Sequence, residues 1–81
     1  MSVRVLFFAS LADITGTREA EADASQHPTV GALFADFAAR FPRLDSYRRL
    51  ILSARNSEYA DAETPVQDGD EIAFFPPVSG G

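Results

Sequence analysis

The sequence predicts an α+β domain in which one main helix packs on one face of a mixed sheet of about five strands. Three observations support this class. The chain has 81 residues, which is enough for one small domain with a single core. Its apolar segments follow the order strand, strand, helix, strand, short strand, strand. No internal repeat and no linker divides the chain, so we expect these segments to form one sheet.

The first two strands are predicted near the start of the chain. Residues 3–9 are almost all β-branched, aromatic or apolar, so we expect a central strand covered on both faces. Residues 13–16 have the composition of a turn. Residues 18–22 alternate charged and small apolar side chains, which indicates a second strand with one solvated face.

The clearest element is a helix over residues 29–41, because its apolar residues fall at helical spacing and form one stripe. Thr29 is a suitable N-cap, and Pro42 ends the helix. The stripe consists of Val30, Leu33, Phe34, Phe37, Ala38 and Phe41.

The second half of the chain is predicted to be mostly strand. We interpret residues 43–49 as a polar connection and residues 50–55 as a strand that turns at Asn56 and Ser57 into a short returning strand near Tyr59. Residues 68–70 form another turn, and residues 71–75 are the last strand. Proline follows at 76 and 77, and proline cannot donate to a sheet ladder.

The composition excludes most side-chain catalysis. The chain has no Cys and no Lys, and His27 is its one histidine, so thiol nucleophiles, zinc–thiolate sites and lysine Schiff bases are absent. The net charge of −5 would repel nucleic acid and anionic membranes. No apolar run reaches the roughly 20 residues of a membrane helix. We therefore expect a cytoplasmic protein that binds neither nucleic acid nor membrane.

The end of the chain is the strongest functional signal. Residues 1–75 are predicted to form the domain, and residues 76–81 an extended, flexible tail that ends in Gly80 and Gly81. Six residues at about 3.3 Å each reach roughly 20 Å, enough to enter the active site of another protein. Glycine passes through narrow channels and leaves the terminal carboxylate unhindered. Adenylyl transfer from ATP would turn that carboxylate into an electrophile.

The last fourteen residues, Asp-Gly-Asp-Glu-Ile-Ala-Phe-Phe-Pro-Pro-Val-Ser-Gly-Gly, resemble the signature of the small subunit of molybdopterin synthase, the MoaD family. The opening segment Val-Leu-Phe-Phe-Ala at residues 5–9, Gly16 and Asn56 also match that family in order and spacing. The resemblance covers essentially the whole chain. It implies a β-grasp, ubiquitin-like fold, in agreement with the order of elements.

The resemblance also implies a mechanism in which this chain is a sulfur carrier and not an enzyme on its own. An adenylating enzyme of the MoeB type would use ATP and magnesium to activate Gly81, and a sulfur relay would convert it to a thiocarboxylate. The loaded tail would enter the large subunit, MoaE, in a heterotetramer and donate sulfur to cyclic pyranopterin monophosphate. The chain itself is expected to bind no cofactor and no metal.

The family's residue roles carry over onto matching positions. Gly81 would hold the sulfur, and the tail residues that would line the partner's channel are Pro76, Pro77, Val78, Ser79 and Gly80. Phe7 and Phe75 match apolar positions that the family uses toward its partners, and for both the alternative is core packing.

One departure from the family pattern concerns residues 12 and 13. Many members carry Arg-Glu where this chain has Ala12 and Asp13, which removes any partner contact made by that arginine.

Two other functions remain open at this point. The same carrier chemistry could serve thiamine synthesis or tRNA thiolation, and a ubiquitin-like protein modifier could be joined through Gly81 to lysines of target proteins.

Overall fold

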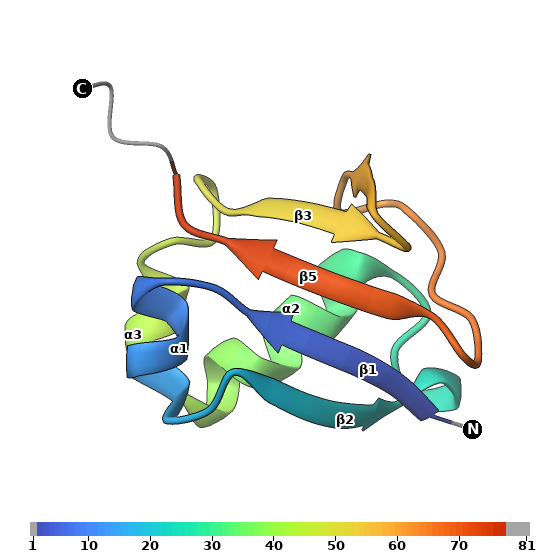
Figure 1. The fold of residues 1–81 in the computed structure, drawn as a ribbon, viewed down its shortest axis with the longest axis horizontal. Coiled ribbons are helices and arrows are strands. Elements are labelled where there is room, and N and C mark those ends of the chain that lie inside the picture. Colours follow the sequence, from blue (N-terminus) through green and yellow to red (C-terminus); the bar gives the residue numbers. More distant parts are fainter. Residues whose placement is uncertain (1, 78–81) are drawn as a thin grey trace.

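A five-stranded mixed sheet with helices on one side makes up the part of the chain that the computed structural model describes, residues 2–77 (Figure 1). The sheet order is β2-β1-β5-β3-β4, and only the central pair β1 and β5 is parallel. The predicted α+β class, five strands and one main helix, is confirmed. The strands are β1 (Ser2–Phe7), β2 (Glu19–Asp23), β3 (Leu52–Arg55), β4 (Glu58–Ala60) and β5 (Glu71–Phe75). The helices are α1 (Ser10–Thr15), the 3₁₀ turn η1 (Ala24–Gln26), α2 (Val30–Arg40) and α3 (Pro42–Asp45).

Helix α2 forms as the sequence predicts. The hydroxyl of Thr29 accepts a hydrogen bond from the Ala32 amide at 3.1 Å, which satisfies one of the free amides at the helix start. The apolar stripe faces the sheet, and Pro42 begins the next short helix. The buried residues of α2 are Val30, Leu33, Phe34, Phe37 and Ala38.

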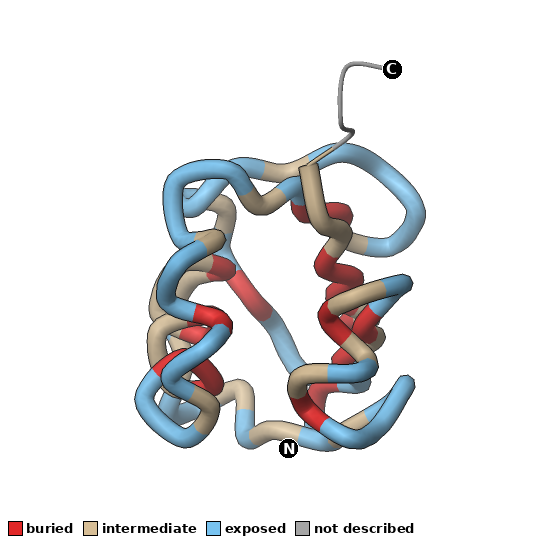
Figure 2. The backbone as a smooth tube through the Cα atoms, turned by 90° about the vertical axis from the view of Figure 1, so that its left-hand side faces the viewer, coloured by how far each residue is buried: buried red, intermediate tan, exposed pale blue. Residues whose placement is uncertain are grey.

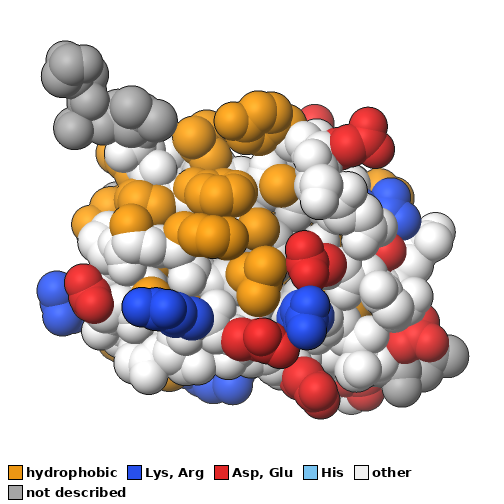
Figure 3. Space-filling view, in the orientation of Figure 1, with side chains coloured by type: hydrophobic (Ala, Val, Ile, Leu, Met, Phe, Trp, Pro, Cys, Tyr) orange, Lys and Arg blue, Asp and Glu red, His pale blue; other side chains and the backbone are white. Residues whose placement is uncertain are grey.

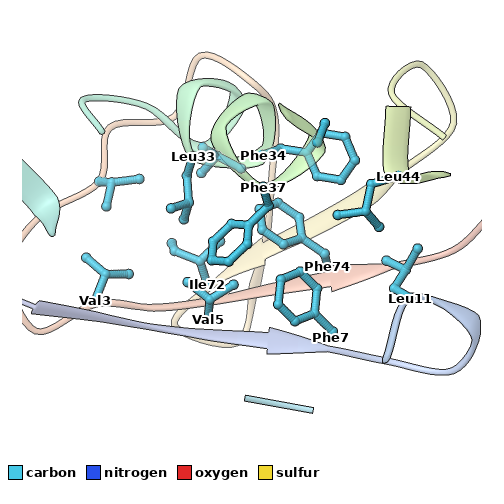
Figure 4. Packing of buried hydrophobic residues seen from close by; sticks show 13 residues of the cluster. Val3, Val5, Phe7, Leu11, Leu33, Phe34, Phe37, Leu44, Ile72 and Phe74 are labelled. Carbon is cyan, nitrogen blue, oxygen red and sulfur yellow. The ribbon is translucent and has the colours of Figure 1, made fainter. Parts of the chain in front are cut away.

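The core lies between α2 and one face of the sheet, called here the inner face (Figure 4). Phe74 from β5 is completely buried and lies at its centre. Its ring centroid is 5.2 Å from that of Phe34 on α2 and 6.1 Å from that of Phe7 on β1. Phe7 in turn meets Phe37 edge to face at 5.1 Å. Such aromatic contacts add to the free energy gained by burial, so these four rings tie the two central strands to the helix.

The sequence predicted that both faces of β1 are covered, and this prediction was wrong. Its residues alternate between buried and accessible: Val3, Val5 and Phe7 are buried, whereas Arg4 is exposed and Leu6 is half-buried. Strand β2 alternates in the same way, between exposed and half-buried residues. Figure 2 shows buried, half-buried and exposed positions following one another along the described chain. In residues 2–77 the helices pack on the inner face only, so successive side chains of β1 meet two different environments.

Two short helices were not predicted. Residues 10–15 form α1, which includes residues 13–15 of the predicted turn. The turn is confirmed only at Gly16, which ends α1 with φ of 77°. The connection expected to be polar contains α3, and its Leu44 is fully buried, as is Leu11 in α1. One buried leucine in each helix is too short a signal for periodicity to detect.

The hairpin between β3 and β4 has the predicted turn. Asn56 and Ser57 both adopt positive φ, 51° and 72°, which is the backbone shape that matches the twist of a two-residue hairpin. Asparagine tolerates this conformation better than most residues. The turn therefore fixes the register of β3 and β4.

A buried carboxylate connects that turn to the start of β5. Asp70 accepts hydrogen bonds from Arg55 Nε at 2.7 Å, from Asn56 Nδ2 at 2.9 Å and from the Gln67 amide at 2.8 Å. Burial alone raises the pKa of Asp70, but these donors outweigh it and hold the pKa below its usual value. Both carboxylate oxygens of Asp70 accept hydrogen bonds, and the ion pair with Arg55 joins the beginning of β5 to the end of β3.

Candidate functional site

The face of the sheet opposite α2, the outer face, carries a group of apolar side chains that no helix covers in residues 2–77 (Figure 3). Phe8 is 42% exposed, Leu52 is 38% exposed and Tyr59 is 82% exposed. Exposed apolar side chains gathered in one area mark a surface that another molecule covers. We call this group the outer-face patch; it consists of Leu6, Phe8, Leu52, Ala54, Tyr59, Ala73 and Phe75.

Strand register brings these residues together from four segments of the chain. Ala73 of β5 lies opposite Leu6 on one side and Ala54 on the other. Leu52 lies opposite Phe75 in the same pairing of β3 with β5. Directly opposed residues in a sheet point to the same face. The sheet order therefore assembles the patch from residues that are not adjacent in the sequence.

Two of the three aromatic rings of the patch, those of Phe8 and Phe75, stack on each other. The ring centroids of Phe8 and Phe75 are 4.6 Å apart, and their planes differ by 14°. The Phe8 amide donates to the Phe74 carbonyl at 3.1 Å, which holds the chain beyond β1 against β5. Beside these rings lies a shallow hollow of about 320 Å³ whose floor is Ala54 and Ala73. A partner's apolar side chain could fill it.

The C-terminal tail begins at this patch. Strand β5 ends at Phe75, and Pro76 and Pro77 follow it half-buried. The end of β5 lies beside the start of β3 (Figure 1). The remaining predicted tail residues, Val78, Ser79, Gly80 and Gly81, lie outside the described residues. A partner that covers the patch would therefore lie beside the point from which the tail starts.

The opposite end of the outer face is charged. The Arg4 guanidinium is 3.1 Å from a carboxylate oxygen of Glu19 and 3.1 Å from one of Glu71. These three side chains span β2, β1 and β5, and they neutralise much of each other's charge. Charged side chains border the apolar area in Figure 3. The outer face thus has an apolar area near the end of β5, and charged side chains border that area.

The two phenylalanines proposed for partner contacts have different positions. Phe7 is 2% exposed and belongs to the core, so of the two alternatives left open for it the structure shows core packing. Phe75 lies on the outer face, half-buried against Phe8. Reasoning from the sequence missed Leu6, Phe8, Leu52 and Tyr59 as surface candidates. The signal was present in residues 3–8, because a domain with one long helix cannot cover both faces of an apolar strand.

Within residues 2–77, no three His, Asp or Glu side chains come close enough to form a metal site. His27 instead makes structural contacts: its Nδ1 is 2.8 Å from the Asp23 carbonyl and its Nε2 is 3.3 Å from an Asp36 carboxylate oxygen. These contacts link η1 to α2. None of the described helices is long and apolar enough to span a membrane.

The sheet order, the single long helix and the exit of the chain from the central strand define the class of protein: this is a β-grasp, ubiquitin-like domain. Comparison with solved structures agrees. SAMP1 from Haloferax volcanii has a TM-score of 0.83 and 34% identity, with all of both chains covered. Subunits 1 and 2 of the molybdopterin-converting factor of Helicobacter pylori form a complex whose matching chain has a TM-score of 0.68 and 27% identity, again over both chains in full.

Sequence comparison gives the particular family. The model of the ThiS family matches residues 5–81. The molybdopterin synthase sulfur carrier subunit of Escherichia coli is 42% identical over 81 residues, covering 98% of this chain and 99% of that relative. The chain belongs to the ThiS family of ubiquitin-like sulfur carriers and, within it, to the small subunits of molybdopterin synthase, the MoaD family.

Proposed function

We propose that this chain carries sulfur on the carboxylate of Gly81 and delivers it to cyclic pyranopterin monophosphate during synthesis of the molybdenum cofactor. The observation that carries the proposal is the position of the tail: β5 ends within the outer-face patch, so docking a partner there places the start of the tail at that partner's surface. The full-length match to a molybdopterin synthase sulfur carrier subunit supports the same role.

Activation would occur on a separate adenylating enzyme of the MoeB type. The Gly81 carboxylate attacks the α-phosphorus of ATP, with magnesium on the phosphates, and pyrophosphate leaves. Hydrosulfide supplied by the relay would then attack the acyl carbon and AMP would leave, which yields the thiocarboxylate. This chain would supply the carboxylate and the docking surface, and the enzyme would supply ATP, magnesium and the catalytic groups.

Sulfur delivery would occur on the large subunit, MoaE, with two copies of each subunit in a heterotetramer. The thiocarboxylate sulfur would bond to a side-chain carbon of the pterin precursor, and an oxygen substituent of the side chain would leave as water or phosphate. Hydrolysis of the acyl–sulfur bond would then leave the sulfur on the pterin and restore the carboxylate. A dithiolene needs two sulfurs, so two loaded carriers are consumed per pterin. The complex of subunits 1 and 2 from Helicobacter pylori supports a large-subunit partner.

Mass spectrometry tests the carrier chemistry directly. The intact protein is incubated with the adenylating enzyme, ATP, magnesium and a sulfur donor, and we expect the mass gain of one sulfur replacing one oxygen at Gly81. The product is then mixed with the large subunit and cyclic pyranopterin monophosphate, where we expect a dithiolene. Absence of the mass gain would contradict every carrier role. A mass gain without dithiolene would favour thiamine synthesis or tRNA thiolation.

A second candidate function follows from the similarity to the small archaeal modifier protein 1 (SAMP1) of Haloferax volcanii, which resembles this chain in both sequence and structure. Here Gly81 would form an amide with a lysine of a target protein. The chain contains no lysine, so it could be attached singly but could not form lysine-linked chains. Expression of a tagged chain, followed by a search for tagged species of higher mass that survive denaturation and disappear when Gly81 is deleted, separates the two functions.

A further inference from the structure

Most arginines of this chain are already paired within residues 2–77. Arg55 lies 2.7 Å from Asp70, Arg40 lies 2.9 Å from Asp36 and Arg48 lies 3.0 Å from Asp45. Arg4 is paired twice. Within the described range, no carboxylate lies within ion-pair distance of the three remaining arginines, which are Arg18, Arg43 and Arg49.

Arg18 differs from the other two in its position beside the outer-face patch. It lines a hollow of about 410 Å³ whose walls include Leu6 and Phe8, and these two residues also line the hollow at the centre of the patch. The two hollows therefore lie next to each other, with Leu6 and Phe8 between them. Arg49 lines a separate groove between α2 and the β3–β4 edge, and Arg43 lies on α3 in the helical layer.

An unpaired acid shares the hollow with Arg18. Asp13 lies on α1, and within residues 2–77 it makes no ion pair. Glu19 also lines the hollow, but its carboxylate is engaged by Arg4 at 3.1 Å. One positive and one negative side chain thus remain uncompensated at this border of the patch.

Hydrogen bonds hold the backbone in place at Arg18 and around Asp13. The Arg18 carbonyl accepts a hydrogen bond from the Phe7 amide at 2.9 Å, which fixes it to the end of β1. Asp13 lies in α1, which Gly16 closes with its amide donating to the Ala12 carbonyl at 2.8 Å. Because the backbone is already fixed at both positions, only the side chains need to be ordered when a partner binds.

We infer that Asp13 and Arg18 form a two-sign contact that orients the large subunit on the outer-face patch, with a carboxylate of that subunit meeting Arg18 and a cation meeting Asp13. This inference rests on the proposed function, because it names the chemistry of the partner on the proposed docking surface. When a partner covers the patch, the border charges lose part of their water, and a like charge opposite either one is unfavourable. The apolar patch supplies contact area, and the two charges select the orientation that brings the tail to its channel.

Exchange of the two charges tests the inference without changing the net charge. The variant carrying Asp13→Arg and Arg18→Asp keeps the net charge of the chain, so general attraction or repulsion is unaltered. We expect its dissociation constant for the purified large subunit to rise about tenfold or more. The loss should shrink in about 1 M salt, where the screening length falls to about 3 Å. A dissociation constant within twofold of the parent would overturn the inference.

A matched pair of single variants provides the control. Arg18→Asp and Arg43→Asp make the same change of charge, and both residues are exposed and unpaired within the described residues. We expect the first to weaken binding about tenfold and the second by less than threefold. Equal losses would show a general charge effect and would also overturn the inference. Circular dichroism and urea unfolding of each variant establish that the domain remains folded.

The outcomes separate this inference from the proposed function. If the parent chain acquires sulfur and forms dithiolene, and the exchange variant does so with unchanged affinity, the carrier role stands and the two-sign contact is wrong. If the parent itself does not bind the large subunit, the carrier role in molybdopterin synthesis is wrong. Recovery of the exchange variant's affinity by reversing one acidic residue of the large subunit to arginine would support the contact directly.

Discussion

The inner and outer faces of the sheet use the same kinds of side chain in different environments. Phe7 and Phe8 are consecutive residues, yet Phe7 is 2% exposed and Phe8 is 42% exposed. Phe74 and Phe75 repeat this arrangement on the neighbouring strand, with Phe74 completely buried and Phe75 half-buried. Each pair stacks with the other pair across β1 and β5, once inside the core and once on the surface.

This difference separates stability from recognition. The inner rings contact α2 and exclude water, so their burial drives folding. The outer rings retain accessible surface that only another molecule can cover. Exposed apolar surface lowers the solubility of a small domain, so the exposed outer rings indicate a surface that binds a partner. Substitutions that affect one face and not the other test this division.

The largest effect is expected at the centre of the core. Phe74→Ala should lower the free energy of unfolding by about 3–5 kcal/mol, because it leaves a cavity between β5 and α2. Phe75→Ala on the outer face should cost about 1 kcal/mol or less. Urea unfolding followed by circular dichroism measures both. Equal losses for the two variants would contradict the division between the faces.

The buried carboxylate at the end of the sheet gives the next largest effect. Asp70→Asn should lower the free energy of unfolding by about 1–3 kcal/mol, because Arg55 and the Gln67 amide lose their charged acceptor. Docking on the outer-face patch should remain within about twofold of the parent, since Asp70 lies outside the patch.

The pH dependence of stability follows from the same residue. The pKa of Asp70 is lowered in the folded state, so its contribution is present above the unfolded value near 3.8 and is lost as the pH falls through the lower folded pKa. Urea unfolding at a series of acidic pH values should show this loss in the parent and a smaller one in Asp70→Asn. Identical pH profiles for the two proteins would contradict the assignment.

The outer face is tested by binding. Phe8→Ser should raise the dissociation constant for the large subunit about tenfold, because an apolar anchor beside the tail is lost. Leu50→Ser is the matched control, since Leu50 is 58% exposed and lies outside the patch. It should leave binding within about twofold. Titration calorimetry measures both, and an equal loss for Leu50→Ser would show that exposed apolar area in general controls affinity.

The smallest effect is expected at the hairpin turn. Ser57 adopts φ of 72°, and Ser57→Gly removes the cost of holding a side chain in that conformation. The free energy of unfolding should rise by about 0.5 kcal/mol. The affinity for the large subunit should not change. This result would show that stability can be altered without changing the inner or the outer face of the sheet. A lower stability would mean that the Ser57 side chain makes a favourable contact there.

Much of the fold was predictable because its signals are local. The stripe of α2, the cap at Thr29 and the turn at Asn56 depend on residues within a few positions of each other. The helices α1 and α3 were not predictable, because each is held by one leucine whose burial depends on distant residues. The prediction for β1 failed for a related reason: its apolar residues indicated a strand, but the number of covered faces depends on where the helices pack.

The proposed sulfur-carrying residue Gly81 lies outside the described residues, so this part of the candidate site stays a prediction. The sequence by itself determined the types of the main elements and the absence of cysteine and lysine, since these follow from residue identity and short spacings. Only the tertiary structure decided which member of each phenylalanine pair faces α2, and that Leu52 and Tyr59 join Phe8 beside the start of the tail. Alternation along a strand fixes which residues share a side, but the side that becomes covered is set by helix packing and by pairing between strands far apart in the chain.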